Sequence, residues 1–171
     1  MKHFEPQLTD EQRAALLGPQ VVLPTLEDTH AFGTRLAAIL RPGDLLVLIG
    51  PLGAGKTALV QGIGAGLGVS GPITSPTFVI ARVHRGRIPL VHVDAYRLGS
   101  LAEVDDLDLD VDLEDSVTCV EWGAGLVEQL AESRLEIALA RAEDSEERTV
   151  RLMPRCADWP ERVAALDISA R

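Results

Sequence analysis

Short apolar runs alternate with stretches of helical periodicity along most of the chain. Runs rich in Val, Leu and Ile predict strands at 21–23, 45–49, 77–83, 88–93, 117–120, 135–140 and 149–153. Apolar residues at helical spacing predict helices at 26–40, 56–67, 101–107, 126–131 and 161–166, with Thr25 as the N-cap of the first. The alternation of strand and helix predicts an α/β fold, in which helices flank a sheet.

The connections between these strands predict how they pair. Leu45–Ile49 is an unbroken aliphatic run, which is typical of a strand buried on both faces of a parallel sheet. The strands at 77–83 and 88–93 are separated by only four residues, and so short a connection predicts an antiparallel hairpin. We therefore expect a mixed, mostly parallel sheet.

The length of 171 residues suits one domain. Residues 1–20 are polar and interrupted by prolines, so we expect an N-terminal extension there and a single domain over 21–171. The longest apolar runs fall far short of the roughly 20 residues that span a bilayer, and the N-terminus has no apolar signal segment. Two cysteines provide neither a disulfide framework nor a four-ligand zinc site. These features predict a cytoplasmic protein that does not bind membranes.

The net charge of −10 comes mainly from one segment. Eight acids and no base lie in 103–115, so the other residues carry 18 acidic and 16 basic side chains. A chain of this charge does not bind nucleic acid by bulk electrostatics, which needs clustered Lys and Arg. The acidic segment is a solvated face or a docking surface for a basic partner. It is not an EF-hand, because the sixth position counted from Asp108 is Leu113 and not glycine.

A phosphate-binding motif follows the run at 45–49. Residues 50–57, called the phosphate loop here, match G-x-x-x-x-G-K-[ST] and precede a predicted helix. Glycines let successive backbone N–H groups point at a polyphosphate, Lys56 supplies a compact charge, and Thr57 offers a hydroxyl to Mg²⁺. The chain contains no asparagine and so lacks the guanine-reading Asn-Lys-x-Asp box, which favours ATP. The expected nucleotide contacts are Leu52, Gly53, Ala54, Gly55, Lys56, Thr57 and Ala58.

A phosphate loop of this kind needs a carboxylate to hold Mg²⁺ or to order water. Asp94 and Glu121 each follow a predicted strand. Glu121 comes after a helical crossover, so its strand runs parallel to the strand before the loop and ends at the same edge. We expect Glu121 to hold the metal directly or through water, and Asp94 to position water or to reach the ion through water.

Hydroxyl side chains occur where many nucleotide switches sense the terminal phosphate. Ser75 and Thr77 flank Pro76 between the phosphate-loop helix and the next strand. They are candidate nucleotide contacts, and an ordinary turn is the equally simple interpretation.

Four motifs together resemble one family, the bacterial ATPase of tRNA threonylcarbamoyladenosine biosynthesis, TsaE or YjeE. Their order and spacing also agree with that family over roughly residues 22–152. The matching residues are Gly53-Ala54-Gly55-Lys56-Thr57, Ser75-Pro76-Thr77-Phe78, His92-Val93-Asp94-Ala95-Tyr96-Arg97-Leu98 and Val120-Glu121-Trp122.

The resemblance implies a small P-loop NTPase-like fold and Mg²⁺-dependent ATP hydrolysis, weak in isolation. It implies two partner proteins of actin-like fold, one of which transfers threonylcarbamoyl to adenosine 37 of tRNAs that read codons beginning with adenine. The ATPase would support repeated cycles of that reaction and would meet tRNA only through the complex. By position, Thr57 and Glu121 become metal ligands, Lys56 the phosphate-contacting base and Asp94 a residue needed for hydrolysis.

Further positions carry over less directly. The resemblance makes residues 75–77 a switch-like loop and places the segment around 25–29, with Leu26, near the adenine. Pro51 stands where the family usually has Asp, so any role of that acid is lost.

Two other functions remain open at this point, a small-molecule kinase and a non-catalytic, ATP-gated interaction module. A kinase needs an acceptor pocket and an Arg-rich lid, and the sequence shows no clear lid. Among the remaining polar residues, His92 is expected to be a satisfied core histidine. Arg148, in a late turn, is expected to be a surface arginine, with a contact to phosphate as the alternative.

Overall fold

The computed structural model describes residues 19–51, 53–74, 81–94, 112–121, 133–155 and 158–166. Several predictions fall outside these residues, namely the extension up to residue 18, the helices at 101–107 and 126–131, and most of the acidic segment. Leu52, Ser75 and Thr77 also lie outside them. In the part of the chain that is described, no helix is long and apolar enough to cross a membrane.

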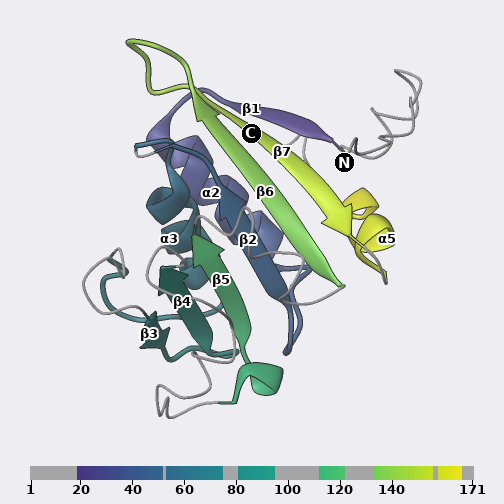
Figure 1. The fold of residues 1–171 in the computed structure, drawn as a ribbon. Coiled ribbons are helices and arrows are strands. Elements are labelled where there is room, and N and C mark those ends of the chain that lie inside the picture. Colours follow the sequence, from purple (N-terminus) through teal and green to yellow (C-terminus); the bar gives the residue numbers. More distant parts are fainter. Residues whose placement is uncertain are drawn as a thin grey trace, which may run out of the picture.

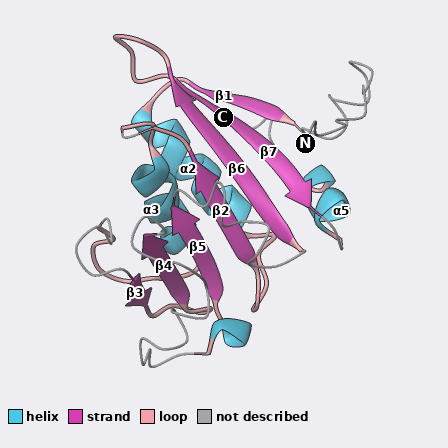
Figure 2. Cartoon of the chain, in the orientation of Figure 1, coloured by secondary structure: helices cyan, strands magenta, loops and turns pink. Residues whose placement is uncertain are grey.

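The described strands form one seven-stranded sheet in the order β1-β7-β6-β2-β5-β4-β3 (Figures 1 and 2). The pairings of β2 with β6 and β5, and of β5 with β4, are parallel, whereas the three pairings nearer the edges are antiparallel. The expected mixed α/β sheet and its hairpin at β3–β4 are confirmed, but the described sheet is not mostly parallel, because β7 pairs antiparallel with both β6 and β1. The strands are β1 Gln20–Leu23, β2 Leu45–Ile49, β3 Ala81–His84, β4 Leu90–Asp94, β5 Val117–Glu121, β6 Arg134–Arg141 and β7 Arg148–Arg155.

The described helices are α2 Leu26–Ala37, α3 Lys56–Gly66 and α5 Trp159–Ala164, with a 3₁₀ turn η2 at Leu113–Asp115. Thr25 caps α2 as predicted. Its hydroxyl accepts a hydrogen bond from the Asp28 N–H at 3.2 Å, and the Asp28 carboxylate accepts one from the Thr25 N–H at 3.0 Å. The helix ends three residues before the predicted 40, because residues 38–40 bond to carbonyls three positions back and the last turn tightens.

The core lies between the sheet and the helices α2 and α3, which lie side by side against one face (Figure 1). Leu46 and Leu48 of β2 share one buried cluster with Phe32 of α2 and Ile63 of α3. Val47, which points to the opposite face, is also fully buried. The central strand is therefore covered on both faces, as its unbroken aliphatic sequence predicts.

Helices α2 and α3 approach so closely that glycine is required at their contact. A Cβ atom built on Gly62 would lie 2.2 Å from the backbone oxygen of His30, and one on Gly33 would lie 2.6 Å from the backbone oxygen of Leu59. Thr34 uses the same contact, since its hydroxyl donates to the Gly62 carbonyl at 3.1 Å. This contact fixes α3, and with it the phosphate loop, against the rest of the core.

Replacing Gly62 with alanine should therefore destabilise the protein by about 1–3 kcal/mol, because backbone must move to admit the methyl group. Gly64→Ala is the matched control in the same helix. Its Cβ would meet the terminal methyl of the flexible Ile73 side chain, and the higher helix propensity of alanine offsets part of any cost. Urea unfolding of both variants measures the difference, and equal free energies of unfolding would contradict this account.

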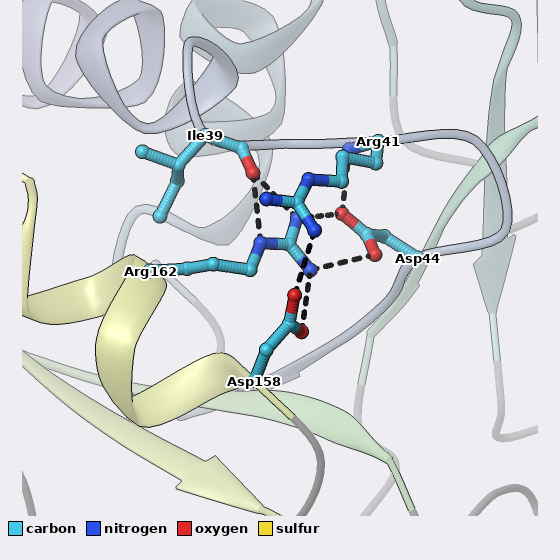
Figure 3. Close-up of polar contacts among 5 residues, drawn as sticks. All are labelled: Ile39, Arg41, Asp44, Asp158 and Arg162. Carbon is cyan, nitrogen blue, oxygen red and sulfur yellow. Dashed lines mark hydrogen bonds and ion pairs between the residues drawn. The ribbon is translucent and has the colours of Figure 1, made fainter.

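A second contact ties the C-terminal helix to the turn before β2 (Figure 3). Arg162 of α5 donates to the Ile39 carbonyl through Nε at 3.1 Å and to Asp44 through Nη1 at 3.0 Å. Its guanidinium also lies 3.9 Å from the centre of the Trp159 ring. Asp158 completes the cluster by accepting from the exposed Arg41 at 2.6 Å.

Candidate functional site

The phosphate loop connects β2 directly to α3, as predicted. Gly53 and Gly55 adopt positive φ angles of 80° and 105°, which side chains other than glycine rarely tolerate. Gly55 is the N-cap of α3 and provides no side-chain cap, so the N–H groups of the first helical turn have no acceptor within the helix. The described part of the loop thus joins two glycines of positive φ to the positive end of a helix, and a helix N-terminus after a glycine-rich loop favours anion binding.

The Lys56 side chain is buried within this loop. Its ammonium donates to the Gly50 carbonyl at 2.6 Å and approaches the Pro51 carbonyl at 3.4 Å. Burial lowers the pKa of this amine, while the nearby carboxylates of Glu121 and Asp94 act in the opposite direction. A negatively charged phosphate would offset the unfavourable burial of the ammonium, so the loop supplies a cation that is poised for an anion.

Two carboxylates end the strands on one side of the loop. Glu121 is the last residue of β5 and Asp94 the last residue of β4, and the two are directly paired across the parallel strands. Leu48 of β2 is paired with Glu121, so all three strands end at the same edge. Both acids are 5% exposed. The predicted parallel alignment of the Glu121 strand with the loop strand is confirmed.

Thr57 and Glu121 meet at this edge. The Thr57 hydroxyl donates to Glu121 Oε1 at 3.3 Å. A hydroxyl and a carboxylate supply the hard oxygen ligands that Mg²⁺ prefers, and Mg²⁺ commonly completes its shell with water and substrate phosphates. The donor set therefore fits the expected ion. The described residues contain no group of three or more His, Cys, Asp or Glu side chains arranged to hold a metal by themselves.

His92 differs from the expectation of a satisfied core histidine. It is fully buried on β4, and its Nε2 lies 3.1 Å from Glu121 Oε1. Neither ring nitrogen makes an aligned hydrogen bond within the described residues. The sequence prediction was wrong because it took the strand as plain core, whereas parity along β4 and β5 places His92 on the same face as Glu121.

Cys119 lies on this face too, two residues before Glu121, but it is not a nucleophile. Burial raises the pKa of its thiol, and the negative charge of Glu121 adds to the effect. The thiol therefore stays protonated and packs as a small apolar side chain.

Arg148 is the functional candidate that sequence reasoning placed wrongly. It is not a surface arginine, because only 8% of it is exposed. A Cβ atom built on Gly55 would lie 3.1 Å from its Nε atom, so the side chain passes directly over the start of α3. Beside it, a cavity of about 460 Å³ separates the loop from the β6–β7 turn, lined by Pro51, Gly53, Ala54, Arg141, Ala142, Glu143 and Asp144.

The remaining candidates are untested. Leu26 is the first residue of α2 and is 38% exposed, and its nearness to adenine stays a prediction. Ser75, Thr77 and Leu52 lie outside the described residues, so their contacts stay predictions as well. Ala58, in the first turn of α3, is half-buried.

Comparison with known proteins gives a consistent result. A family model described as threonylcarbamoyl adenosine biosynthesis protein TsaE matches residues 23–150. A tRNA threonylcarbamoyladenosine biosynthesis protein TsaE from Mycobacterium tuberculosis is 52% identical over 147 residues, covering 80% of this chain and 88% of that protein. The protein of the same name from Streptomyces coelicolor is 63% identical over 114 residues, covering 64% of this chain and 77% of that protein.

A solved structure is similar in fold. The crystal structure of Bacillus subtilis YdiB superposes with a TM-score of 0.71 at 32% identity and covers 85% of this chain and 91% of that chain. The P-loop NTPase-like α/β fold expected from the sequence is thereby confirmed. The span matched by the family model contains the phosphate loop, both carboxylates and Arg148.

Proposed function

The chain belongs to the TsaE family of threonylcarbamoyl adenosine biosynthesis proteins, and on that premise we propose that it is a Mg²⁺-dependent ATPase. It serves formation of the threonylcarbamoyl group on adenosine 37 of tRNAs that read codons beginning with adenine. It acts in the cytoplasm with two partner proteins of actin-like fold, through which it meets tRNA. Its hydrolysis, weak in the isolated chain, supports multiple turnovers of the complex.

The observation that carries this proposal is the edge of the sheet where the phosphate loop faces two buried carboxylates. The loop N–H groups and Lys56 bind the phosphates of ATP, and Lys56 supplies the charge that offsets theirs. Thr57 and Glu121 would hold Mg²⁺, which would supply positive charge to the phosphate oxygens. Asp94, on the neighbouring strand, orients the attacking water.

The test is reconstitution of the modification with the two partner proteins, tRNA, threonine, bicarbonate and ATP. We expect several modified tRNAs per complex with the wild-type chain. Lys56→Ala should allow no more than the first round, because the loop loses its only ammonium. A thermal melt of Lys56→Ala establishes that the variant is folded.

Three outcomes would contradict parts of the proposal. Many rounds of modification without this chain would remove its role in turnover. Wild-type turnover with a Lys56→Ala chain that binds no ATP would remove the energetic role. Phosphate transferred to an added metabolite would favour a kinase.

A further inference from the structure

The strand order brings β7 to the phosphate loop from the side opposite the carboxylates. β6 runs parallel to β2 and therefore ends at the same edge as the loop, at Arg141. β7 runs antiparallel to β6, and its first residue, Arg148, is paired with Arg141. In the sheet order β7 and β6 lie on one side of β2, whereas β5 and β4, which carry Glu121 and Asp94, lie on the other. Arg148 is thus set at the loop but away from the proposed metal ligands.

The Arg148 side chain contacts the residue at which the phosphate-loop helix begins. A Cβ atom on Gly55 would lie 3.1 Å from its Nε and 3.5 Å from its Cδ. Gly55 is the N-cap of α3, and its φ of 105° turns the chain into the helix. A Cβ atom here would press against the arginine, and the positive φ would strain any residue other than glycine.

The charge of Arg148 is not balanced within the described residues. One terminal nitrogen, Nη1, donates to the carbonyl of Glu146, a neutral acceptor. Nε is buried and has no hydrogen-bond partner, and the side chain makes no ion pair with any described residue. A guanidinium stays protonated, and a buried, unpaired charge is unfavourable. The positive end of α3, whose N-cap Gly55 lies beside the arginine, adds to the cost.

We propose that Arg148 is a further ligand of the nucleotide phosphates. Its free N–H groups donate to the nucleotide phosphates at the start of α3, which are present in both ADP and ATP, so it acts in binding rather than in the hydrolytic step. The anion supplies what the buried guanidinium lacks, namely an acceptor for Nε and a countercharge. This inference rests on the proposed nucleotide binding and names an additional residue for it.

The test compares Arg148→Met with the wild type and with Arg151→Met, which removes the same charge from the same strand three residues further on. Affinity for Mg·ADP and for inorganic pyrophosphate is measured by calorimetry, and the melting temperature is measured without ligand. Arg148→Met should weaken both ligands about 10- to 100-fold, the range expected for lost hydrogen bonds to a charged group. Its ligand-free melting temperature should equal or exceed that of the wild type, because an unpaired buried charge has been removed. Arg151→Met should bind as the wild type does.

Arg148→Lys keeps the charge without the planar fork and serves if the methionine variant fails to fold. About tenfold weaker binding is expected, because one ammonium replaces a bidentate donor.

Several results would overturn the inference. Unchanged affinity in both Arg148 variants would do so. If the affinity is unchanged and the ligand-free melting temperature falls, Arg148 serves the stability of the fold instead. Weaker ADP with unchanged pyrophosphate would place the contact at the base or ribose. An equal loss of affinity in Arg151→Met would mean that the effect comes from the net charge of the protein and not from a contact of Arg148. A wild-type chain that binds neither ligand would overturn the proposed function and this inference with it.

Discussion

Replacing Glu121 with glutamine is expected to slow Mg²⁺-dependent ATP hydrolysis at least about 100-fold, since changing a residue that only supports a metal ligand already costs about 10- to 100-fold. The glutamine has the same shape and still accepts a hydrogen bond from Thr57, which lies 3.3 Å from Oε1. What it removes is the negative charge that, in the proposed function, holds a divalent cation against the phosphates. Single-turnover hydrolysis as a function of Mg²⁺ concentration measures the effect.

Glu136→Gln is the matched control for this change. Glu136 is a glutamate of the same sheet, 8% exposed against 5% for Glu121, and it pairs with Arg134 at 3.0 Å and with Arg155 at 3.3 Å. Because these partners lie on β6 and β7 rather than at the phosphate loop, hydrolysis below the melting temperature should stay within about twofold of the wild type. Wild-type hydrolysis by Glu121→Gln would remove this residue from the metal site.

Asp94→Asn distinguishes the two roles proposed for the carboxylates, namely holding the metal and orienting the attacking water. If Asp94 orients the attacking water, the asparagine variant loses hydrolysis but keeps the gain in nucleotide affinity that Mg²⁺ provides. Glu121→Gln should lose both. The opposite pattern would exchange the roles assigned to the two paired carboxylates.

Local sequence patterns were sufficient for the centre of the fold and for one side of the site. The aliphatic run of β2 predicts a strand buried on both faces, and the glycines after it predict the loop. Because carboxyl ends of parallel strands meet at one edge, the position of Glu121 at the end of β5 also predicts its approach to Thr57. These inferences need only the alternation of side chains along a strand and the parallel pairing of β2 with β5.

The other side of the site depends on long-range pairing that a short segment does not encode. Arg148 follows a polar turn with Glu146 and Glu147, a context that is typical of the surface. It is buried because β7 adds to β6, and β6 to β2, which brings the start of β7 over the loop. The environment of His92 likewise depends on the register of β4 with β5.

The surroundings of Arg162 also depend on contacts between segments that are far apart in the sequence, and these contacts stabilise the protein. Replacing Arg162 with methionine is expected to lower the free energy of unfolding by about 3–5 kcal/mol, the range for breaking a buried ion pair. The change leaves the Asp44 carboxylate, whose side chain is 11% exposed, without its cation and the Ile39 carbonyl without its donor (Figure 3). For a chain of this length the melting temperature should fall by about 6–20 °C. Calorimetry or urea unfolding provides the measurement.

Arg41→Met is the control from the same cluster. The Arg41 side chain is 64% exposed, and so is much of its partner Asp158, at 45%. Solvent screens such a pair, so the substitution should cost only about 0–1 kcal/mol. Equal losses from the two arginines would mean that the burial of Arg162 contributes nothing beyond an ordinary surface contact.

Adding Asp44→Asn to Arg162→Met separates the contribution of the Arg162–Asp44 ion pair from that of the packing of Arg162. If the loss arises from a stranded carboxylate, removing that charge restores part of the stability, and the double variant costs less than the sum of the single ones. The backbone N–H of Arg41 also donates to Asp44, at 2.6 Å, and the asparagine oxygen can retain that bond. Additive losses would instead assign the effect to the stacking of Arg162 on Trp159, 3.9 Å from the ring centre, and would leave the ion pair without net stabilising value.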